Sequence, residues 1–425
     1  MNLSQKKLIE KYLVNYGEVE LNHYKSLHIK AFENCLVIPA YQEEYQSLKK
    51  VWAAIGKNVL IILVVNAPIA GDKKTQELIK NILLDARTLS HRKNQNLSFL
   101  VNSEGHSILV VDRCSVPIPS KLGVGLARKI GADIALSMII SKHIITPWIY
   151  CTDADVSLPS TYFHAIENIS KKSSAFIYAF RHQTTDEHQE ACLLYEASLL
   201  YYVAGLRFAS SAYAHPTIGS TIVISAYSYA AVRGFPCRSA GEDFYLLNKL
   251  AKVGKIQQLR TPTITISGRL SDRVPFGTGV GIKRIVDRSS PDSEYLFYNP
   301  KVFLALKALL ERLRNCQDIS NFEEYFLAGG IYGSILIQWS ETQQLFDTIR
   351  SKQSQKGPVF DKFIHDWMDG FRTLKFIHFV RDNHFPSIPW PALFDGIVLP
   401  AKGPTENEIE IQQLHTALRK VLEQP

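Results

Sequence analysis

An apolar run that ends in two acids sets the strongest constraint on how this chain can fold. Residues Trp148–Cys151 are apolar, and after one threonine the sequence continues Asp153-Ala154-Asp155. A strand of this composition would deliver both carboxylates to the carboxyl edge of a sheet, where open α/β folds bind their ligands. Paired hard oxygens suit Mg²⁺ or Mn²⁺, which complete their shells with substrate phosphates. A solvated turn or a helix cap is the competing interpretation.

Short β-type runs alternate with segments of helical period through the first two thirds of the chain. The expected strands are Cys35–Ile38, Val59–Val65, Ile108–Val111, Trp148–Cys151, Ala175–Phe180 and Thr221–Ser225. The expected helices are Glu43–Ile55, Lys73–Leu89, Val124–His143 and Glu187–Phe208. Thr184 and Glu187 have the spacing of a capping box that would open the last helix. The alternation predicts an α/β fold with a Rossmann-like, mostly parallel central sheet flanked by helices.

The pattern changes beyond about Asp287, where only helical periodicity remains. The helices expected there are Val302–Leu313, Tyr325–Trp339, Leu345–Ile349, Phe360–Val380 and Glu406–Leu422. The first thirty residues also have an amphipathic helical pattern. We therefore expect a helical N-terminal extension over residues 1–30, an α/β domain over 31–286 and a helical C-terminal region over 287–425.

Charge and cysteine content narrow the function classes. A formal charge of +8 favours an anionic partner such as nucleotide phosphates or an acidic lipid surface, although it is equally a solubility property. The sequence has no Lys/Arg run or recognised nucleic-acid module, so we expect no nucleic-acid partner. The six cysteines are scattered without Cys-x-x-Cys, which predicts free thiols instead of a zinc site or disulfide framework. The chain begins without a signal-peptide core, and its most apolar run, Val59–Val65, is too short to span a bilayer. These features predict a cytoplasmic protein.

Five local signals follow one another in a fixed order, and the order is more specific than any single member. They are Val37–Glu44, the strand ending at Asn66, the helix start Lys121–Gly131, Asp153-Ala154-Asp155, and Gly241-Glu242-Asp243. With this ordered set, residues 32–285 resemble the family-2 glycosyltransferases of the GT-A fold. The family's Pro-x-Tyr-Asn-Glu appears as Pro39-Ala40-Tyr41-Gln42-Glu43, its Ala-Arg-Asn-x-Gly as Ala127–Gly131, its metal motif as Asp153 and Asp155, and its Glu-Asp pair as Glu242 and Asp243.

The resemblance implies a donor site for a nucleotide-diphosphate sugar. Pro39, Ala40, Tyr41, Glu43 and Asn66 would lie on the nucleoside side, with Tyr41 stacking on the base and Glu43 accepting from ribose or base donors. Core packing is the alternative role for Tyr41.

The residues at the start of the next helix would face the diphosphate. Gly123 and Gly125 would let backbone N–H groups approach phosphate, although tight packing explains them equally well. Lys121 and Arg128 would add positive charge beside the diphosphate, or could be surface cations.

The acids would carry the chemistry. Asp155 would hold Mn²⁺ or Mg²⁺ between the two phosphates, and Asp153 would contact the ribose or the ion's water shell. Asp243 would accept the proton of the acceptor hydroxyl, with Glu242 as the alternative base. Favourable charge at a helix N-terminus is the structural alternative for this pair.

Two further segments have functional character. His215–Ser220 precedes a strand and could form an acceptor-side wall. The Gly-rich basic loop Ser267–Gly281 could close over the donor, with Arg269 or Arg273 clamping phosphate, or could be an ordinary surface loop.

The chain also departs from the family pattern. The family's second strand usually ends in Asp-Asp, whereas Asn66-Ala67 stands here, so the base is open; Asp112 could compensate. The Gln-x-x-Arg-Trp motif of processive synthases is absent, which favours addition of one sugar.

We therefore expect a metal-dependent, inverting, nonprocessive glycosyltransferase acting on a small-molecule or lipid-linked acceptor. The alternatives are a retaining GT-A transferase and a noncatalytic GT-A-like module that binds nucleotide-sugars. Phe371–Arg381 mixes aromatic and basic residues, which leaves open a peripheral membrane contact, although a buried helix explains it as well.

Overall fold

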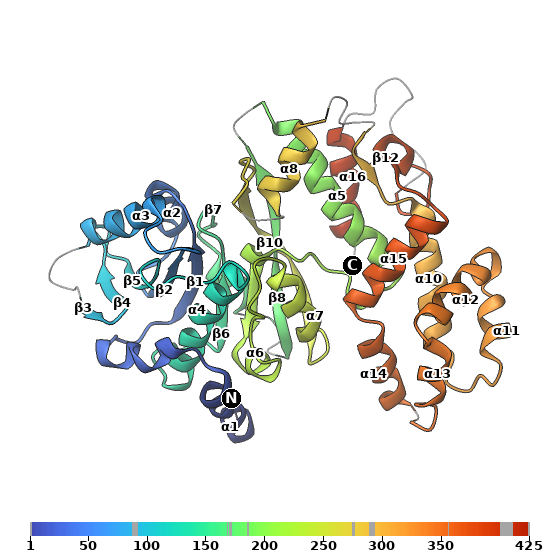
Figure 1. Cartoon of the computed structure of the whole chain (residues 1–425), viewed down its shortest axis with the longest axis horizontal. Helices are drawn as coiled ribbons and strands as arrows, with labels where there is room; N and C mark the ends of the chain where they lie inside the picture. Colours follow the sequence, from blue (N-terminus) through green and yellow to red (C-terminus); the bar gives the residue numbers. More distant parts are fainter. Residues whose placement is uncertain are drawn as a thin grey trace. The chain divides into compact units, whose positions relative to one another are not determined.

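The computed structural model describes residues 2–86, 92–167, 169, 172–184, 187–273, 277–288, 294–355, 357–399 and 411–423. The chain forms two compact units (Figure 1). The sheet unit comprises residues 1–183 and 217–280, and the helical unit comprises 184–216 and 281–425. These units differ from the expected segments 1–30, 31–286 and 287–425 in two ways. The N-terminal residues belong to the sheet unit, and residues 184–216 belong to the helical unit.

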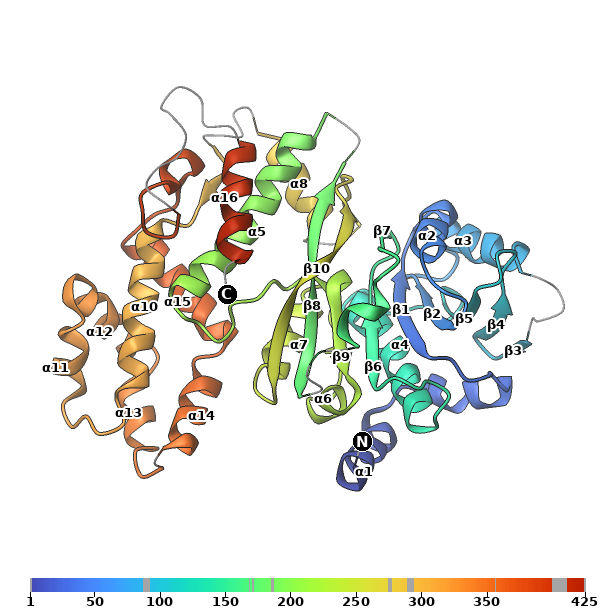
Figure 2. The ribbon, with the colours of Figure 1, turned by 180° about the vertical axis from the view of Figure 1, so that it is seen from behind.

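The described part of the sheet unit contains one ten-stranded sheet in the order β3-β4-β5-β2-β1-β6-β9-β8-β10-β7. Strands β5, β2, β1 and β6 pair in parallel, as do β8 and β10, whereas β4, β9 and β7 run antiparallel to their neighbours (Figure 2). This confirms the predicted α/β class with a mostly parallel central sheet. The strands are β1 Asn34–Ala40, β2 Val59–Asn66, β3 Arg92–Asn94, β4 Leu97–Val101, β5 Ser107–Arg113, β6 Trp148–Cys151, β7 Val156–Ser157, β8 Ser173–Gln183, β9 Ile222–Ser225 and β10 Lys255–Ser267.

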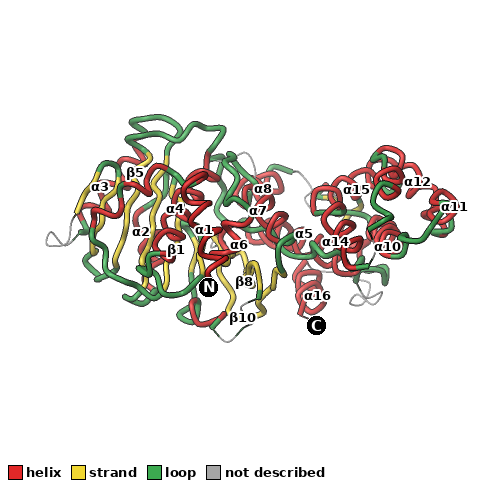
Figure 3. The backbone as a smooth tube through the Cα atoms, turned by 90° about the horizontal axis from the view of Figure 1, so that it is seen from below, coloured by secondary structure: helices red, strands yellow, loops and turns green. Residues whose placement is uncertain are grey.

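The central strands could be recognised in the sequence because they are buried along their whole length and are therefore continuously apolar. Every residue of β1 and β2 is buried, as expected where helices cover both faces of a parallel sheet. Alternate residues of β1 and β2 share one core with α1, α4 and α6, and α4 lies across both strands (Figure 3). The helices and 3-10 turns of this unit are α1 Leu3–Tyr16, η1 Val19–Asn22, η2 Tyr24–Leu27, α2 Tyr45–Ala53, α3 Lys73–Leu84, α4 Gly123–Ile140, η4 Phe163–Ile166, η5 Gly219–Thr221, α6 Ala226–Ala231 and α7 Glu242–Leu250; α8 Thr278–Val286 begins here and continues into the helical unit.

In the described part of the sheet unit, the sequence analysis missed four strands, for identifiable reasons. Strands β3 and β4 form a short hairpin whose first strand is polar, and β7 has two residues. The long strand β10 contains Pro262 and a register shift between Gln258 and Thr263, so its side-chain alternation is broken. Proline and a bulge together remove the period-2 signal on which strand prediction depends.

The N-terminal helix is fixed to the sheet unit by a buried polar network. The carboxylate of Asp133 on α4 is fully buried and accepts hydrogen bonds from Tyr12 Oη at 2.7 Å and Tyr229 Oη at 2.9 Å. Lys129 Nζ lies 2.7 Å from the same carboxylate and 2.8 Å from Glu18. Burial raises the pKa of Asp133, and Lys129 opposes that shift. Residues of α1, α4 and α6 therefore share one satisfied buried charge.

The helical unit contains most of the expected C-terminal helices, with two corrections. The predicted helix Tyr325–Trp339 is interrupted between Leu327 and Gly333, and Gly330, with a φ of 68°, lies in this break. The predicted helix Phe360–Val380 is two helices, because the Asp369 side chain accepts from the N–H groups of Phe371 and Arg372 and starts a new helix. The elements are α5 Gln189–Phe208, β11 Leu296–Phe297, α10 Pro300–Arg314, α11 Phe322–Leu327, η6 Gly330–Tyr332, α12 Gly333–Thr342, α13 Leu345–Arg350, α14 Pro358–Trp367, α15 Gly370–Asn383, β12 Ile388–Pro389, η7 Trp390–Leu393 and α16 Ile411–Glu423.

Three smaller predictions also have outcomes. The capping box was wrong: α5 has His188 as its N-cap with no side-chain cap hydrogen bond, so Glu187 precedes the helix. Phe376, Ile377 and Val380 are buried within α15, so the aromatic and basic stretch Phe371–Arg381 is a core helix.

The ends of two predicted helices, residues 87–89 and 406–410, lie outside the described residues, as do 185–186 of the capping motif. Across the described ranges, no helix combines the length and apolar character needed to cross a membrane.

Removing the Tyr12 hydroxyl tests the buried network. In Tyr12→Phe, the Asp133 carboxylate loses a donor that burial prevents water from replacing. We expect the free energy of unfolding to fall by about 1–3 kcal/mol in urea titrations. Tyr16→Phe is the matched control, because this half-exposed ring lies one turn later on α1. A loss in Tyr16→Phe equal to that in Tyr12→Phe would contradict the network's role.

Candidate functional site

Three loops meet at the carboxyl edge of the sheet, as parallel strands require. Arg269, just after β10, places Nη2 2.5 Å from Glu43 Oε2 and 2.9 Å from Asp155 Oδ2. Arg273 Nη1 lies 2.5 Å from Glu43 Oε1 and donates to the Tyr41 carbonyl at 2.6 Å. We call Glu43, Asp155, Arg269 and Arg273 the edge cluster. The structure thus brings together four residues predicted from three separate motifs.

Burial disfavours the charged form of Asp155, although the edge cluster pairs two carboxylates with two guanidiniums. Burial, and then the neighbouring Glu43, raise the pKa of Asp155 to about 6, while Arg269 opposes the shift. A carboxylate in this situation favours an additional positive charge within a few ångströms. The predicted phosphate clamps, Arg269 and Arg273, are here bound to carboxylates, so an anionic ligand would have to compete for them or add to them.

A second cluster lies around Arg128 on α4. Its guanidinium donates from Nη2 to Asp153 Oδ1 at 2.5 Å and from Nε to Glu242 Oε1 at 2.8 Å. Arg128 is 3% exposed, so it is not a surface cation. With Asp243, which follows Glu242, we call these residues the inner cluster. It connects the end of β6 to the first turn of α7.

Asp243 has the properties expected of a general base. It lies in the first turn of α7, is partly exposed, and its Oδ1 accepts from the N–H of Phe244 at 2.7 Å. Burial and the adjacent Glu242 raise the pKa of Asp243 to about 7 against the opposing effect of Arg128. Glu242 is nearly buried and its Oε1 is taken by Arg128. Of the two predicted candidates, Asp243 is therefore the more accessible and the better matched to neutral pH.

The glycines at the start of α4 have a packing role. A Cβ on Gly125 would lie 2.4 Å from the Pro236 carbonyl oxygen, and one on Gly123 would lie 2.7 Å from Ser239 Cα. The N–H of Gly125 already donates to the Arg238 carbonyl at 2.9 Å. Close approach of the 236–239 segment therefore explains both glycines, and the expected phosphate contact through Gly125 is wrong for this conformation. Lys121, just before them, is exposed.

The predicted nucleoside side is only partly assembled. Pro39 and Ala40 are the last residues of β1 and pair with the end of β2, where Asn66 is buried. Tyr41 is half-buried, and burial followed by the nearby Asp72 raises its pKa. Tyr41 therefore lies at the correct edge with part of its ring accessible, and the two predicted roles remain compatible with its position.

Asp112 does not lie free to compensate for Asn66. Its Oδ1 accepts from the N–H groups of Cys114 and Ser115, and its Oδ2 accepts from Ser115 Oγ at 2.6 Å. The side chain therefore closes its own turn. The acid near Tyr41 is instead Asp72, which caps α3 and accepts from Gln42 Nε2 at 2.8 Å. Sequence reasoning missed it, although an Asp before a helical pattern is the usual sign of a cap.

The segment His215–Ser220 divides between the two units, with His215 and Pro216 in the helical unit and the rest in the sheet unit. His215 is buried, and burial lowers its pKa to about 4, so the imidazole is neutral near pH 7. Gly219 packs against Arg128: a Cβ there would lie 2.5 Å from Nη2. This segment thus supports the inner cluster, a role that the sequence did not indicate.

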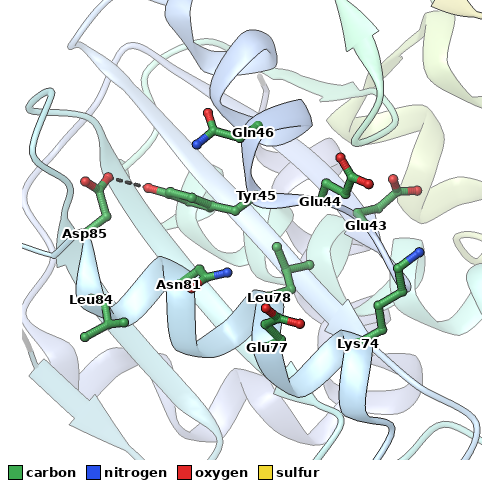
Figure 4. Close-up of a pocket in the computed structure, with 10 residues that line it drawn as sticks. All are labelled: Glu43, Glu44, Tyr45, Gln46, Lys74, Glu77, Leu78, Asn81, Leu84 and Asp85. Carbon is green, nitrogen blue, oxygen red and sulfur yellow. Dashed lines mark hydrogen bonds between the residues drawn. The ribbon is translucent and has the colours of Figure 1, made fainter.

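A pocket of about 630 Å³ lies between α2 and α3 and reaches the edge cluster at Glu43 (Figure 4). The figure also shows Tyr45 Oη hydrogen-bonded to Asp85 across it. The lining residues are Glu43, Glu44, Tyr45, Gln46, Lys74, Glu77, Leu78, Asn81, Leu84 and Asp85. Because α2 follows β1 directly, this pocket extends the strand-end site along the helices.

The donor set fits a divalent ion that takes few protein ligands. Within the ranges described above, no group of three His, Cys, Asp or Glu side chains is arranged to hold a metal. Asp155 is 21% exposed and Asp153 37% exposed, so both carboxylates are accessible to small ions. Mg²⁺ commonly binds one or two carboxylates together with substrate phosphates. The residues therefore fit an ion completed by a phosphorylated ligand, and not a dedicated protein cage.

The chain has distant likenesses among solved structures. No protein-family model and no curated protein matches the chain. A solved structure of Staphylococcus aureus TarS, residues 1–349 with UDP-GlcNAc, aligns with a TM-score of 0.38 and 10% identity, covering 80% of this chain and 92% of that one. The same TarS segment with UDP aligns with a TM-score of 0.34 and 13% identity, covering 80% and 91%. At this level of similarity, function has to be argued from the chain's own site.

The raised pKa of Asp243 has a measurable consequence for stability. A group whose pKa is raised on folding holds its proton more tightly in the folded chain, so wild-type stability falls as pH rises from about 4 to about 7. Asp243→Asn removes that penalty. We expect its melting temperature, relative to wild type, to be higher at pH 8 than at pH 5. The exposed Asp361→Asn serves as control; an Asp243→Asn difference that is independent of pH would contradict the assignment.

Proposed function

We propose that this chain is a glycosyltransferase that moves a sugar from a nucleotide-diphosphate donor to an acceptor hydroxyl, with the GT-A fold of the family-2 type. One observation carries the proposal. The inner cluster joins Asp153, beside the proposed metal ligand, to Glu242, beside the proposed base, through a single guanidinium. A transferase needs its leaving-group side and its acceptor side within one sugar's length, and this link meets that requirement.

The donor side would use the edge cluster. Asp155 would hold Mn²⁺ or Mg²⁺, with Asp153 beside it, and the ion would neutralise charge on the departing diphosphate. Arg269 and Arg273 carry two further positive charges on the same edge and would exchange carboxylate partners for phosphate oxygens. Tyr41, Glu43 and Asn66 would face the nucleoside. A positively charged chain is consistent with an anionic donor.

The acceptor side would use Asp243. Its carboxylate would take the proton of the acceptor hydroxyl while that oxygen attacks the anomeric carbon of the donor sugar. The bond from that carbon to the diphosphate oxygen breaks, and the oxygen leaves with the electron pair. Attack from the side opposite the leaving group inverts the anomeric configuration. The absence of the processive motif after Glu242-Asp243 favours a single transfer per encounter.

The first test is donor binding by isothermal titration. A panel of sugar nucleotides covering the common bases is titrated into the full chain with and without Mn²⁺. We expect one of them to bind in a Mn²⁺-dependent manner, and Asp155→Asn to lose that dependence. Asp361→Asn is the control for a lost surface charge. Donor affinity that Asp155→Asn leaves unchanged with Mn²⁺ present would place the ion elsewhere.

The second test separates binding from chemistry. Asp243→Asn should keep donor affinity while its kcat falls by about 10²–10⁴-fold, the usual contribution of a general base. Wild-type kcat should decline below about pH 7, as the Asp243 carboxyl takes up its proton. The product's anomeric configuration distinguishes inversion from the retaining alternative. Donor binding without turnover in the wild type, over a broad acceptor panel, would instead identify a noncatalytic nucleotide-sugar module.

A further inference from the structure

We propose that Arg128 is a positioning residue that sets the distance between the donor-side Asp153 and the acceptor-side Glu242–Asp243 pair, and that it does not bind the diphosphate. This inference rests on the proposed function. It gives the arginine of the helix motif a role different from the phosphate contact expected from the sequence.

The surroundings of Arg128 enclose its guanidinium. The residue is 3% exposed, its Nε and Nη2 atoms are engaged by Glu242 and Asp153, and its Nη1 is buried without a hydrogen-bond partner. The backbone of Gly219 packs directly on the guanidinium, with space for no Cβ between them. A phosphate oxygen could reach Nε or Nη2 only by displacing a carboxylate from a buried pair, which would leave that carboxylate uncompensated, and it could reach the buried Nη1 only if the surrounding residues moved.

The helix that carries Arg128 is itself held firmly. One turn later, Gly131 lies so close to β1 that a Cβ would be 2.5 Å from Val37 Cγ1. On its outer side, α4 is tied to α1 and α6 through Asp133. Arg128 therefore projects from a backbone fixed on two sides, and carboxylates bound to it take their positions from α4.

Guanidinium geometry suits this task. Its planar fork offers donors in two directions at once, so one side chain can fix carboxylates from β6 and α7. A lysine ammonium at the same place is a point charge on a flexible stem and would not hold both with defined geometry. The inner cluster also contains three carboxylates, from Asp153, Glu242 and Asp243, around one buried cation. Loss of the guanidinium would let them separate.

The test compares binding with turnover in Arg128→Lys and Glu242→Gln. In both, we expect donor affinity, measured by titration with Mn²⁺ present, to stay within about threefold of wild type. We expect kcat to fall by about 100-fold, as for a misplacement of about 1 Å between reacting groups. The double variant should be no slower than the slower single variant, because both changes break the same link.

Arg419→Lys provides the matched control. Arg419 also pairs with a buried glutamate, Glu196, but in the helical unit. It should keep wild-type kcat. If Arg128→Lys does not fold, Glu242→Gln alone carries the test, since it preserves the side-chain volume and removes only the charge.

Three results would overturn the inference. A fall in donor affinity as large as the fall in kcat/KM in Arg128→Lys would mean that the guanidinium contacts the diphosphate. An unchanged kcat in both single variants would mean that the Arg128–Glu242 ion pair does not set the distance between the donor-side and acceptor-side acids. Fully additive losses in the double variant would mean that the two residues act separately. Failure of the wild type to bind any sugar nucleotide would instead overturn the proposed function itself, which the wild-type titration alone reveals.

Discussion

The buried ion pairs of Arg128 are the interaction on which the rest of the site depends. A guanidinium withdrawn from water must be compensated, and here carboxylates from two distant chain segments provide the compensation. Displacement of either carboxylate would therefore leave the buried guanidinium without full compensation. This requirement explains why the end of β6, the start of α7 and the backbone at Gly219 converge on α4. It also explains how a protein can hold several acids close together without their repulsion separating them.

The sequence specified the central fold well because its signals there are strong. The strand pattern over Trp148–Cys151 matches β6 residue for residue, and the runs at β1 and β2 are buried along their full length. Hydrophobic burial on both faces leaves few alternatives for such runs. Where the signal depended on alternation, as in β10, a proline and a bulge removed it. Where it depended on continuity, as in Tyr325–Trp339, a glycine with positive φ interrupted a helix that periodicity alone could not divide.

The candidate site was predictable as a set of residues, but not as a set of partners. Motif order indicated Glu43 and Asp155, the Gly-rich basic loop indicated Arg269 and Arg273, and all four meet at one edge. Their mutual pairing depends on loops whose conformations no local pattern encodes. The same applies to Gly125. Its sequence context suggests a phosphate-binding glycine, but in the structure residues 236–239 pack against it. Side chains such as Asp72 were missed because their importance comes from a neighbour far away in the sequence.

The path of the chain through its two units has a consequence for how the protein can be divided. In the sequence, helix α5 lies between the two segments of the sheet unit. In the structure, it packs with α10 and α16, which come from the C-terminal part of the chain. A cut after residue 286 would thus leave a fragment that still carries α5, with buried residues such as Leu194, Leu200 and Leu206, but lacks α10 and α16. Such a fragment would expose apolar surface and tend to aggregate. Removal of residues 184–216 together with everything after 280 would instead follow the boundary between the two units.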